Sequence, residues 1–192
     1  MANGAMTTGS AGEKNVREHM IHNGMVDCIV QMPDKLFLTT GIPACLFLLS
    51  KNRDGRDGEH RERIKEILFI DARKLGHMVN RRLRVFSDDD ILKVASAYHQ
   101  WRSNKHVTPG MLKGNYIDVD GFCKAATLEE VAANNYVLSP GRYVGTEAEE
   151  DDGISFEEKM NKLTVELAEQ FEESKGLELQ IKENLKSVGF DL

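Results

Sequence analysis

The sequence predicts an α/β fold, in which strands of a layered sheet are followed by a helical segment and by one long C-terminal helix. Two apolar runs of strand length, Val26–Met32 and Ile42–Ser50, lie close together, and a third run spans Glu66–Asp71. A helical pattern at Glu13–Asn23 leads directly into the first run, and such an alternation is typical of layered sheets. Beyond Ser155, apolar residues recur at the three- and four-residue spacing of a helix.

The second apolar run predicts a strand in the middle of the sheet. Its centre, Ala44–Leu49, does not alternate with polar residues, so a strand here needs cover on both faces. A buried helix is the alternative, but Gly41 and Pro43 at the start of the run favour a strand. Because no crossover helix separates the first two runs, they must pair antiparallel if they pair. With Glu66–Asp71 we expect an antiparallel sheet edge of three strands.

Start and stop signals place the shorter elements. Asn23-Gly24 ends the first helix, and Ser87, followed by three aspartates, is a good helix N-cap. Thr127 and Glu130 form a capping box for a short helix that ends near Ala133. Residues 1–12 are expected to form a loop, and the polar segment 51–66 is either a hairpin tip or a disordered insertion. Residues 103–118 give no clear pattern.

The C-terminal helix has the clearest signal in the chain. Ser155 and Glu158 form a capping box, and Gly176 is the one candidate position for a kink or break. At about 1.5 Å per residue the helix reaches roughly 50 Å, which is longer than a small domain is wide. We therefore expect a partner, or a second copy of the chain, to cover its apolar stripe. The predicted partner-binding residues are Phe156, Met160, Leu163, Leu167, Phe171, Leu177, Ile181 and Leu185.

Charge and cysteine content exclude several classes of protein. The 192-residue chain has a formal net charge of −6 and a pI near 5.6, which argues against a free-standing nucleic-acid binder. Residues 51–84 are basic and residues 145–192 are acidic, so the segments are expected to have different roles. Three widely spaced cysteines indicate neither a disulfide framework nor a metal site. Without a signal peptide or a membrane-spanning run, the chain is expected in the cytoplasm.

Several spaced motifs resemble one known family. These are Pro33, Phe37 and Thr39–Pro43 with the apolar strand that follows, then FIDARKLG at Phe69–Gly76, GFCKAATLEEV at Gly121–Val131 and YVLSPGRYVG at Tyr136–Gly145. Together they resemble the target-base region of adenine-N6 DNA methyltransferases, and more narrowly the modification subunit of Type I restriction-modification systems. The likeness covers nearly the whole chain, but only the C-terminal part of the family's pattern.

The resemblance implies the fold and the function to expect. Residues 1–86 would be the trailing strands of a Rossmann-like methyltransferase sheet, 87–150 a helical and loop segment, and 151–192 a long assembly helix. The intact family enzyme transfers a methyl group from S-adenosylmethionine to adenine N6 in DNA. It works with a specificity subunit that reads the DNA, so the implied partners are that subunit and, within the assembled complex, DNA.

The resemblance also assigns candidate DNA-binding residues. Phe37 matches the base-contacting region and would stack on a flipped adenine, although an aromatic residue between two leucines can equally plug the core. Thr39 and Thr40 could donate to a base or phosphate, yet threonines in tight loops more often bond their own backbone. The basic segment Arg81, Arg82 and Arg84 is the better candidate for phosphate contact, and the arginines of the 51–66 loop are the weaker one.

Two family motifs are missing from this sequence. The four prolines are never adjacent, so there is no Asn/Asp-Pro-Pro-aromatic motif, and no Gly-rich turn follows a strand. We therefore expect no catalytic residues, no bound metal and no S-adenosylmethionine for this chain alone. Two functions stay open: the C-terminal part of a modification subunit, or a non-catalytic interaction module, produced by truncation, that docks to a specificity subunit or to itself.

Overall fold

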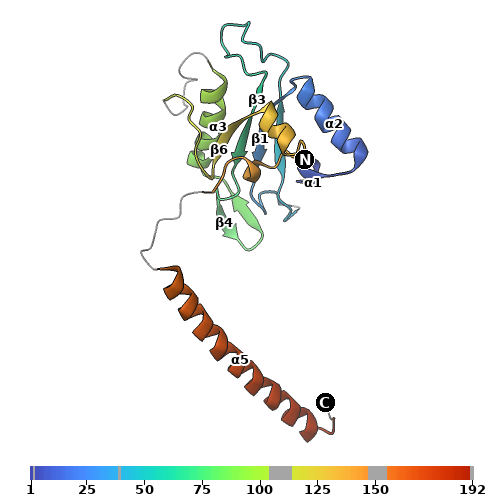
Figure 1. The fold of residues 1–192 in the computed structure, drawn as a ribbon, viewed down its shortest axis with the longest axis vertical. Helices are drawn as coiled ribbons and strands as arrows, with labels where there is room; N and C mark the ends of the chain where they lie inside the picture. The colour runs from blue at the N-terminus through green and yellow to red at the C-terminus, as the bar shows by residue number, and fades with distance from the viewer. Residues whose placement is uncertain (2, 39, 104–113, 147–154, 191–192) are drawn as a thin grey trace. The chain divides into compact units, whose positions relative to one another are not determined.

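The α/β fold is confirmed by the computed structural model of the chain, which describes residues 1, 3–38, 40–103, 114–146 and 155–190 (Figure 1). Two compact units are present, Met1–Ala148 and Glu149–Leu192. The first contains a four-stranded sheet with helices on both faces. The second contains one long helix. In the described part of the chain, no helix combines the length and apolar character needed to cross a membrane.

The sheet is mixed, with strand order β2-β1-β3-β6. Its strands are β1 (Val26–Gln31), β2 (Cys45–Leu49), β3 (Glu66–Asp71) and β6 (Cys123–Thr127). The predicted antiparallel pairing of β1 with β2 is confirmed. The prediction of three antiparallel strands is wrong, because β3 runs parallel to β1 and antiparallel to β6. The carboxyl ends of β1 and β3 therefore lie at the same end of the sheet.

The prediction that the second apolar run lies in the middle of the sheet is also wrong. β2 is an edge strand on which Leu46 and Leu49 are exposed, whereas every residue of β1 is buried. The interior of the sheet is formed by β1 and β3, whose charged residues lie near the strand ends: Asp27 on β1, and Glu66 and Asp71 on β3. Apolar composition alone does not distinguish a strand covered on both faces from an edge strand with an apolar outer surface.

Helices pack against both faces of the sheet. On one face, α1 (Gly4–Thr7), α2 (Ala11–His22), α4 (Leu128–Ala133) and the 3-10 turn η1 (Pro140–Arg142) cover a core that includes Ile29 and Phe69. On the other face, α3 (Asp88–Arg102) brings Trp101 onto Leu68 and Ile70. Figure 1 shows α2 and α3 on opposite sides of the sheet. Residues on both sides of position 86 share this sheet, because β6 pairs with β3.

Local capping signals were reliable predictors of where helices begin. Ser87, Thr127 and Ser155 each accept a hydrogen bond from the backbone N–H three residues later, and the acidic side chain there bonds back to the cap. The short strands β4 (His77–Asn80), β5 (Leu83–Val85) and β6 were not predicted. Nor was α1, whose Met6 is buried in the core although residues 1–12 read as a polar loop.

Buried charges order the polar loop 50–65. Asp27 on β1 is fully buried, and its carboxylate accepts from Arg63 Nε at 2.8 Å and from the Tyr98 hydroxyl at 2.7 Å. Arg53 Nε lies 3.0 Å from Oδ1 of the same carboxylate and forms a second ion pair with it. Arg53 also donates to the carbonyl oxygen of Gly24 at 2.9 Å. The loop is therefore neither a hairpin tip nor disordered.

The second unit contains α5 (Phe156–Ser187), which continues through Gly176 without a break. None of its residues is buried. An isolated helix gains little stability in water unless its apolar face is covered. The apolar residues of α5 are therefore not covered within its own unit.

The buried charge network is testable by unfolding. We expect Asp27→Asn to lower the free energy of unfolding by about 3–5 kcal/mol, because it leaves two buried guanidinium groups without their counter-charge. Urea denaturation followed by fluorescence of Trp101, the single tryptophan, measures the change. Arg56→Gln in the same loop is the matched control, since the Arg56 side chain is 88% exposed and its loss should cost less than about 0.5 kcal/mol. Equal losses in the two variants would contradict the role assigned to Asp27.

Candidate nucleic-acid interface

The candidate site lies at the end of the sheet where β1 and β3 terminate. The loop 32–44 joins β1 to β2 at this end, and the β4–β5 hairpin follows β3. The two are linked directly, because the backbone N–H of Arg84 donates to the carbonyl oxygen of Lys35 at 2.8 Å. Figure 1 shows the hairpin projecting from this end, with the loop 50–65 at the opposite end. The loop that carries Phe37 and Thr40 is thus held beside the hairpin that carries the arginines.

Phe37 is exposed on the loop 32–44. Its side chain is 45% exposed, and its neighbours Leu38 and Ile42 are 81% and 64% exposed. The carbonyl oxygen of Phe37 accepts from the backbone N–H of Thr40 at 3.2 Å, which closes the loop tip. This exposure speaks against the alternative in which Phe37 plugs the core. Its stacking on a base stays a prediction.

Of the two threonines in the loop 32–44, the structure describes only Thr40. The Thr40 hydroxyl oxygen accepts from the backbone N–H of Ile42 at 3.1 Å, the local bond that threonine often makes in a turn. Thr40 is exposed, so its hydroxyl hydrogen is accessible to a ligand. Thr39 lies outside the described residues.

The three arginines of the β4–β5 hairpin fall into two groups. Arg81 and Arg82 are exposed at the tip, where Asn80 Oδ1 accepts from the backbone N–H groups of Arg82 and Leu83 and fixes the turn. Arg84 is partly buried at the base, and its guanidinium donates to the carbonyl oxygens of Leu75 and Gly76 at 3.3 and 3.1 Å. Arg84 therefore braces the hairpin, whereas Arg81 and Arg82 present their charges to solvent.

A buried carboxylate with an exposed arginine completes this end of the sheet. Asp71, the last residue of β3, is 8% exposed and holds the guanidinium of Arg73. Sequence reasoning gave these residues no role, although both lie within the FIDARKLG motif. Arg53 and Arg63 were among the weaker candidates for phosphate contact. Both are buried against Asp27 at the other end of the sheet.

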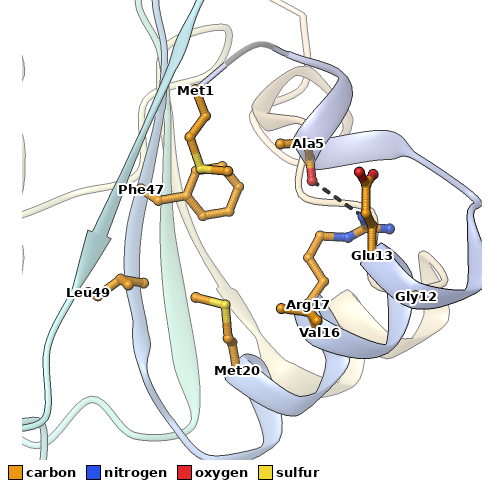
Figure 2. A pocket seen from close by; sticks show the side chains of 9 residues that line it. All are labelled: Met1, Ala5, Gly12, Glu13, Val16, Arg17, Met20, Phe47 and Leu49. Carbon is orange, nitrogen blue, oxygen red and sulfur yellow. Dashed lines mark hydrogen bonds between the residues drawn. The ribbon is translucent and has the colours of Figure 1, made fainter.

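An apolar groove lies between the edge strand β2 and the helices α1 and α2 (Figure 2). It encloses about 320 Å³. Its lining residues are Met1, Ala5, Gly12, Glu13, Val16, Arg17, Met20, Phe47 and Leu49. The guanidinium of Arg17 donates to the carbonyl oxygens of Ala5, Thr8 and Tyr136. The groove thus offers apolar contact and one carboxylate, which does not fit a nucleoside cofactor that needs several polar partners.

The predicted partner-binding residues all lie on α5. Seven of the eight are exposed, with exposed fractions between 45% and 75%, and Leu185 is partly buried. Val165 and Leu179, on the opposite side of the helix, are exposed as well. No group of three or more His, Cys, Asp or Glu side chains that could hold a metal ion is found among the residues that the structure describes.

Known proteins match this chain along its length. It is 44% identical over 191 residues to the Type I restriction enzyme HindI methylase subunit of Haemophilus influenzae, covering 100% of this chain and 39% of that protein. It is 36% identical over 191 residues to the Type I restriction enzyme MjaIX methylase subunit of Methanocaldococcus jannaschii, covering 99% and 31%. The chain therefore spans about two fifths or less of the length of these relatives.

A solved structure and a family match agree with these relatives. The type I restriction-modification system methyltransferase subunit from Streptococcus thermophilus superposes with a TM-score of 0.59 at 27% identity, covering 76% of this chain and 25% of that one. Residues 1–152 match the family described as N-6 DNA Methylase. With four fifths of its length inside that match, the chain belongs to the N-6 DNA methylase family.

Proposed function

We propose that this chain forms the C-terminal part of the modification subunit of a Type I restriction-modification system. The intact subunit would transfer a methyl group from S-adenosylmethionine to adenine N6 in DNA, and would act in the cytoplasm on cellular DNA. The observation that carries the proposal is the match of the whole chain to methylase subunits. The exposed Phe37 at the end of the parallel strands β1 and β3 supports it, since this is where α/β sheets bind their ligands.

The role proposed for this end of the sheet is to receive the target base. An enzyme that modifies a base within duplex DNA extrudes it and holds it by stacking and by hydrogen bonds to its edge. Phe37 would supply the stacking face, and Thr40 a hydroxyl. Arg81 and Arg82 at the hairpin tip would contact phosphates on the flanking DNA. Thr39, which belongs to the same loop, is proposed for the same function on sequence grounds alone.

We propose that methyl transfer itself depends on parts of a longer protein. The chain has no Asn/Asp-Pro-Pro-aromatic motif and no Gly-rich turn after a strand. The groove beside β2 does not fit S-adenosylmethionine either. Residues 1–192 would thus contribute the base-contacting loop and an assembly helix, and no step of the chemistry.

The partner proposed for α5 is the specificity subunit of the same system. The supporting observation is an apolar stripe on a 32-residue helix with no buried residue. When the chain is alone, a second copy would cover the stripe. The rival function, a non-catalytic interaction module, uses the same surface but predicts no contribution of Phe37 to DNA binding.

Phe37 distinguishes the two functions. In the full-length subunit assembled with its partner, Phe37→Ala should weaken DNA binding by about 1–3 kcal/mol, the usual contribution of a base–aromatic stack. Because Phe37 is half exposed, the thermal stability of the protein should change little. Leu38→Ala is the control, since it removes an exposed apolar side chain from the same loop. Unchanged DNA affinity in Phe37→Ala would reject the stacking role.

The cofactor expectation is tested by calorimetry. We expect no saturable heat when S-adenosylmethionine is added at millimolar concentration to the 192-residue chain, because its sequence contains no Gly-rich turn after a strand like the one with which the family holds the cofactor. The full-length subunit is the positive control. A saturable signal at micromolar cofactor with the short chain would overturn this expectation.

The assembly helix is tested by sedimentation. We expect the purified chain to form a dimer or a larger species, and Leu163→Asp with Ile181→Asp to dissociate it, because each change places a charge in an apolar seam. The matched control is Val165→Asp with Leu179→Asp. Val165 and Leu179 each lie two residues from a stripe position, which places them about 200° around the helix. Their side chains are about as exposed as those of Leu163 and Ile181. A strictly monomeric wild type at high concentration, with the helix folded back on residues 1–145, would show that the stripe is ordinary core.

A further inference from the structure

The pair formed by Asp71 and Arg73 differs from the other ion pairs at the surface. The Nε of Arg73 donates to both carboxylate oxygens of Asp71, at 2.9 and 3.0 Å, and Nη2 donates to Oδ2 at 2.5 Å. The backbone N–H of Arg73 donates to Oδ1 at 3.1 Å. The side chain of Asp71 is 8% exposed, whereas that of Arg73 is 54% exposed. A buried carboxylate therefore fixes the orientation of an exposed guanidinium.

The surrounding backbone leaves room for this arrangement. Asp71 is anchored on β3, where its backbone N–H donates to the carbonyl oxygen of Phe122 at 2.7 Å. Gly141 in η1 lies against the pair, and a Cβ atom there would sit 2.9 Å from Nη2 of Arg73. The backbone of Gly141 is not in the left-handed region, so space and not conformation is what the glycine provides.

The guanidinium retains one free edge. Arginine has five N–H donors, and Asp71 occupies the edge formed by Nε and Nη2. No residue in the described part of the chain accepts a hydrogen bond from Nη1. The edge formed by Nη1 and Nη2 can therefore donate two parallel hydrogen bonds, the geometry in which arginine binds a phosphate. The bonds to Asp71 also raise the pKa of Arg73, so its charge is retained.

The position of the pair indicates which phosphate it would meet. Arg73 follows the end of β3, at the same end of the sheet as the Phe37 loop and the β4–β5 hairpin. A phosphate group here would belong to the DNA that brings its base to Phe37.

We propose that Arg73 binds a phosphodiester group of the bound DNA, and that Asp71 is a positioning residue that holds the guanidinium ready for it. This inference rests on the proposed function, because it takes DNA as the ligand of this end of the sheet. A guanidinium that is already restrained loses less conformational entropy on binding than a mobile one. A phosphate contact positions DNA without reading its sequence.

The experiment measures the salt dependence of DNA binding by the full-length subunit assembled with its partner. Arg73→Gln should weaken binding about tenfold, equally for the recognised site and for unrelated DNA. It should also reduce the slope of log affinity against log salt by about one. Arg56→Gln is the control, since it removes the same charge from an exposed side chain at the opposite end of the sheet. Its salt slope should equal that of the wild type.

Two further variants separate positioning from charge. Arg73→Lys keeps the charge but not the paired donors, so it should retain the wild-type salt slope with reduced affinity. Gly141→Ala keeps both partners and places a methyl group against Nη2, so it should also reduce affinity.

A lowered melting temperature of Arg73→Gln with an unchanged salt slope would show that the pair only closes the turn after β3. If the wild-type assembly binds no DNA, the proposed function fails with it; if it binds normally and the slope of Arg73→Gln is unchanged, only this inference fails.

Discussion

The fully buried Asp27 is the interaction on which the rest of the first unit depends. A carboxylate taken out of water is costly unless it is paired and hydrogen-bonded, and Arg53, Arg63 and Tyr98 meet that need. The two arginines belong to the loop 50–65, which passes from the end of β2, across the start of β1, to the start of β3. By pinning this loop, the ion pairs favour β3 beside β1 and parallel to it. The parallel pairing in turn brings the Phe37 loop, the hairpin and Arg73 to one end of the sheet.

The sequence could predict the elements whose signals are local. The three helix N-caps and the bounds of β3 were correct because hydrogen bonds within four residues and a short apolar run determine them. The central position of β2 and the antiparallel direction of β3 were wrong because they depend on pairings between distant residues, such as Ile29 with Phe69. The strand β6 was missed because its sequence, CKAAT, contains few β-branched or aromatic residues, and it is held in the sheet by pairing with β3.

The same limit applies to the candidate site. Phe37 and the hairpin arginines were identified from a resemblance and from local composition, and their exposure is consistent with both. The sequence ranked the loop arginines below those of the hairpin, but it did not show that Arg53 and Arg63 are buried at the other end of the sheet. The distinguishing residue is Asp27, which precedes Arg63 by 36 positions. Arg73 was missed for a related reason, because the burial of Asp71 beside it comes from the fold and not from its neighbours in sequence.

The acidic character of the chain makes the orientation of these few arginines important. With a formal net charge of −6, the chain has no overall positive field to attract DNA, and its acidic residues are concentrated in the C-terminal part. Affinity for phosphate must therefore come from short-range contacts whose geometry is set in advance. At one end of the sheet the arginines neutralise a buried carboxylate and hold the fold together. At the other, Arg73 is itself held by a buried carboxylate, and its remaining donors face outward. An aspartate–arginine pair thus stabilises the protein at Asp27, where both partners are buried. At Asp71 only the carboxylate is buried, and the same kind of pair orients the guanidinium for binding.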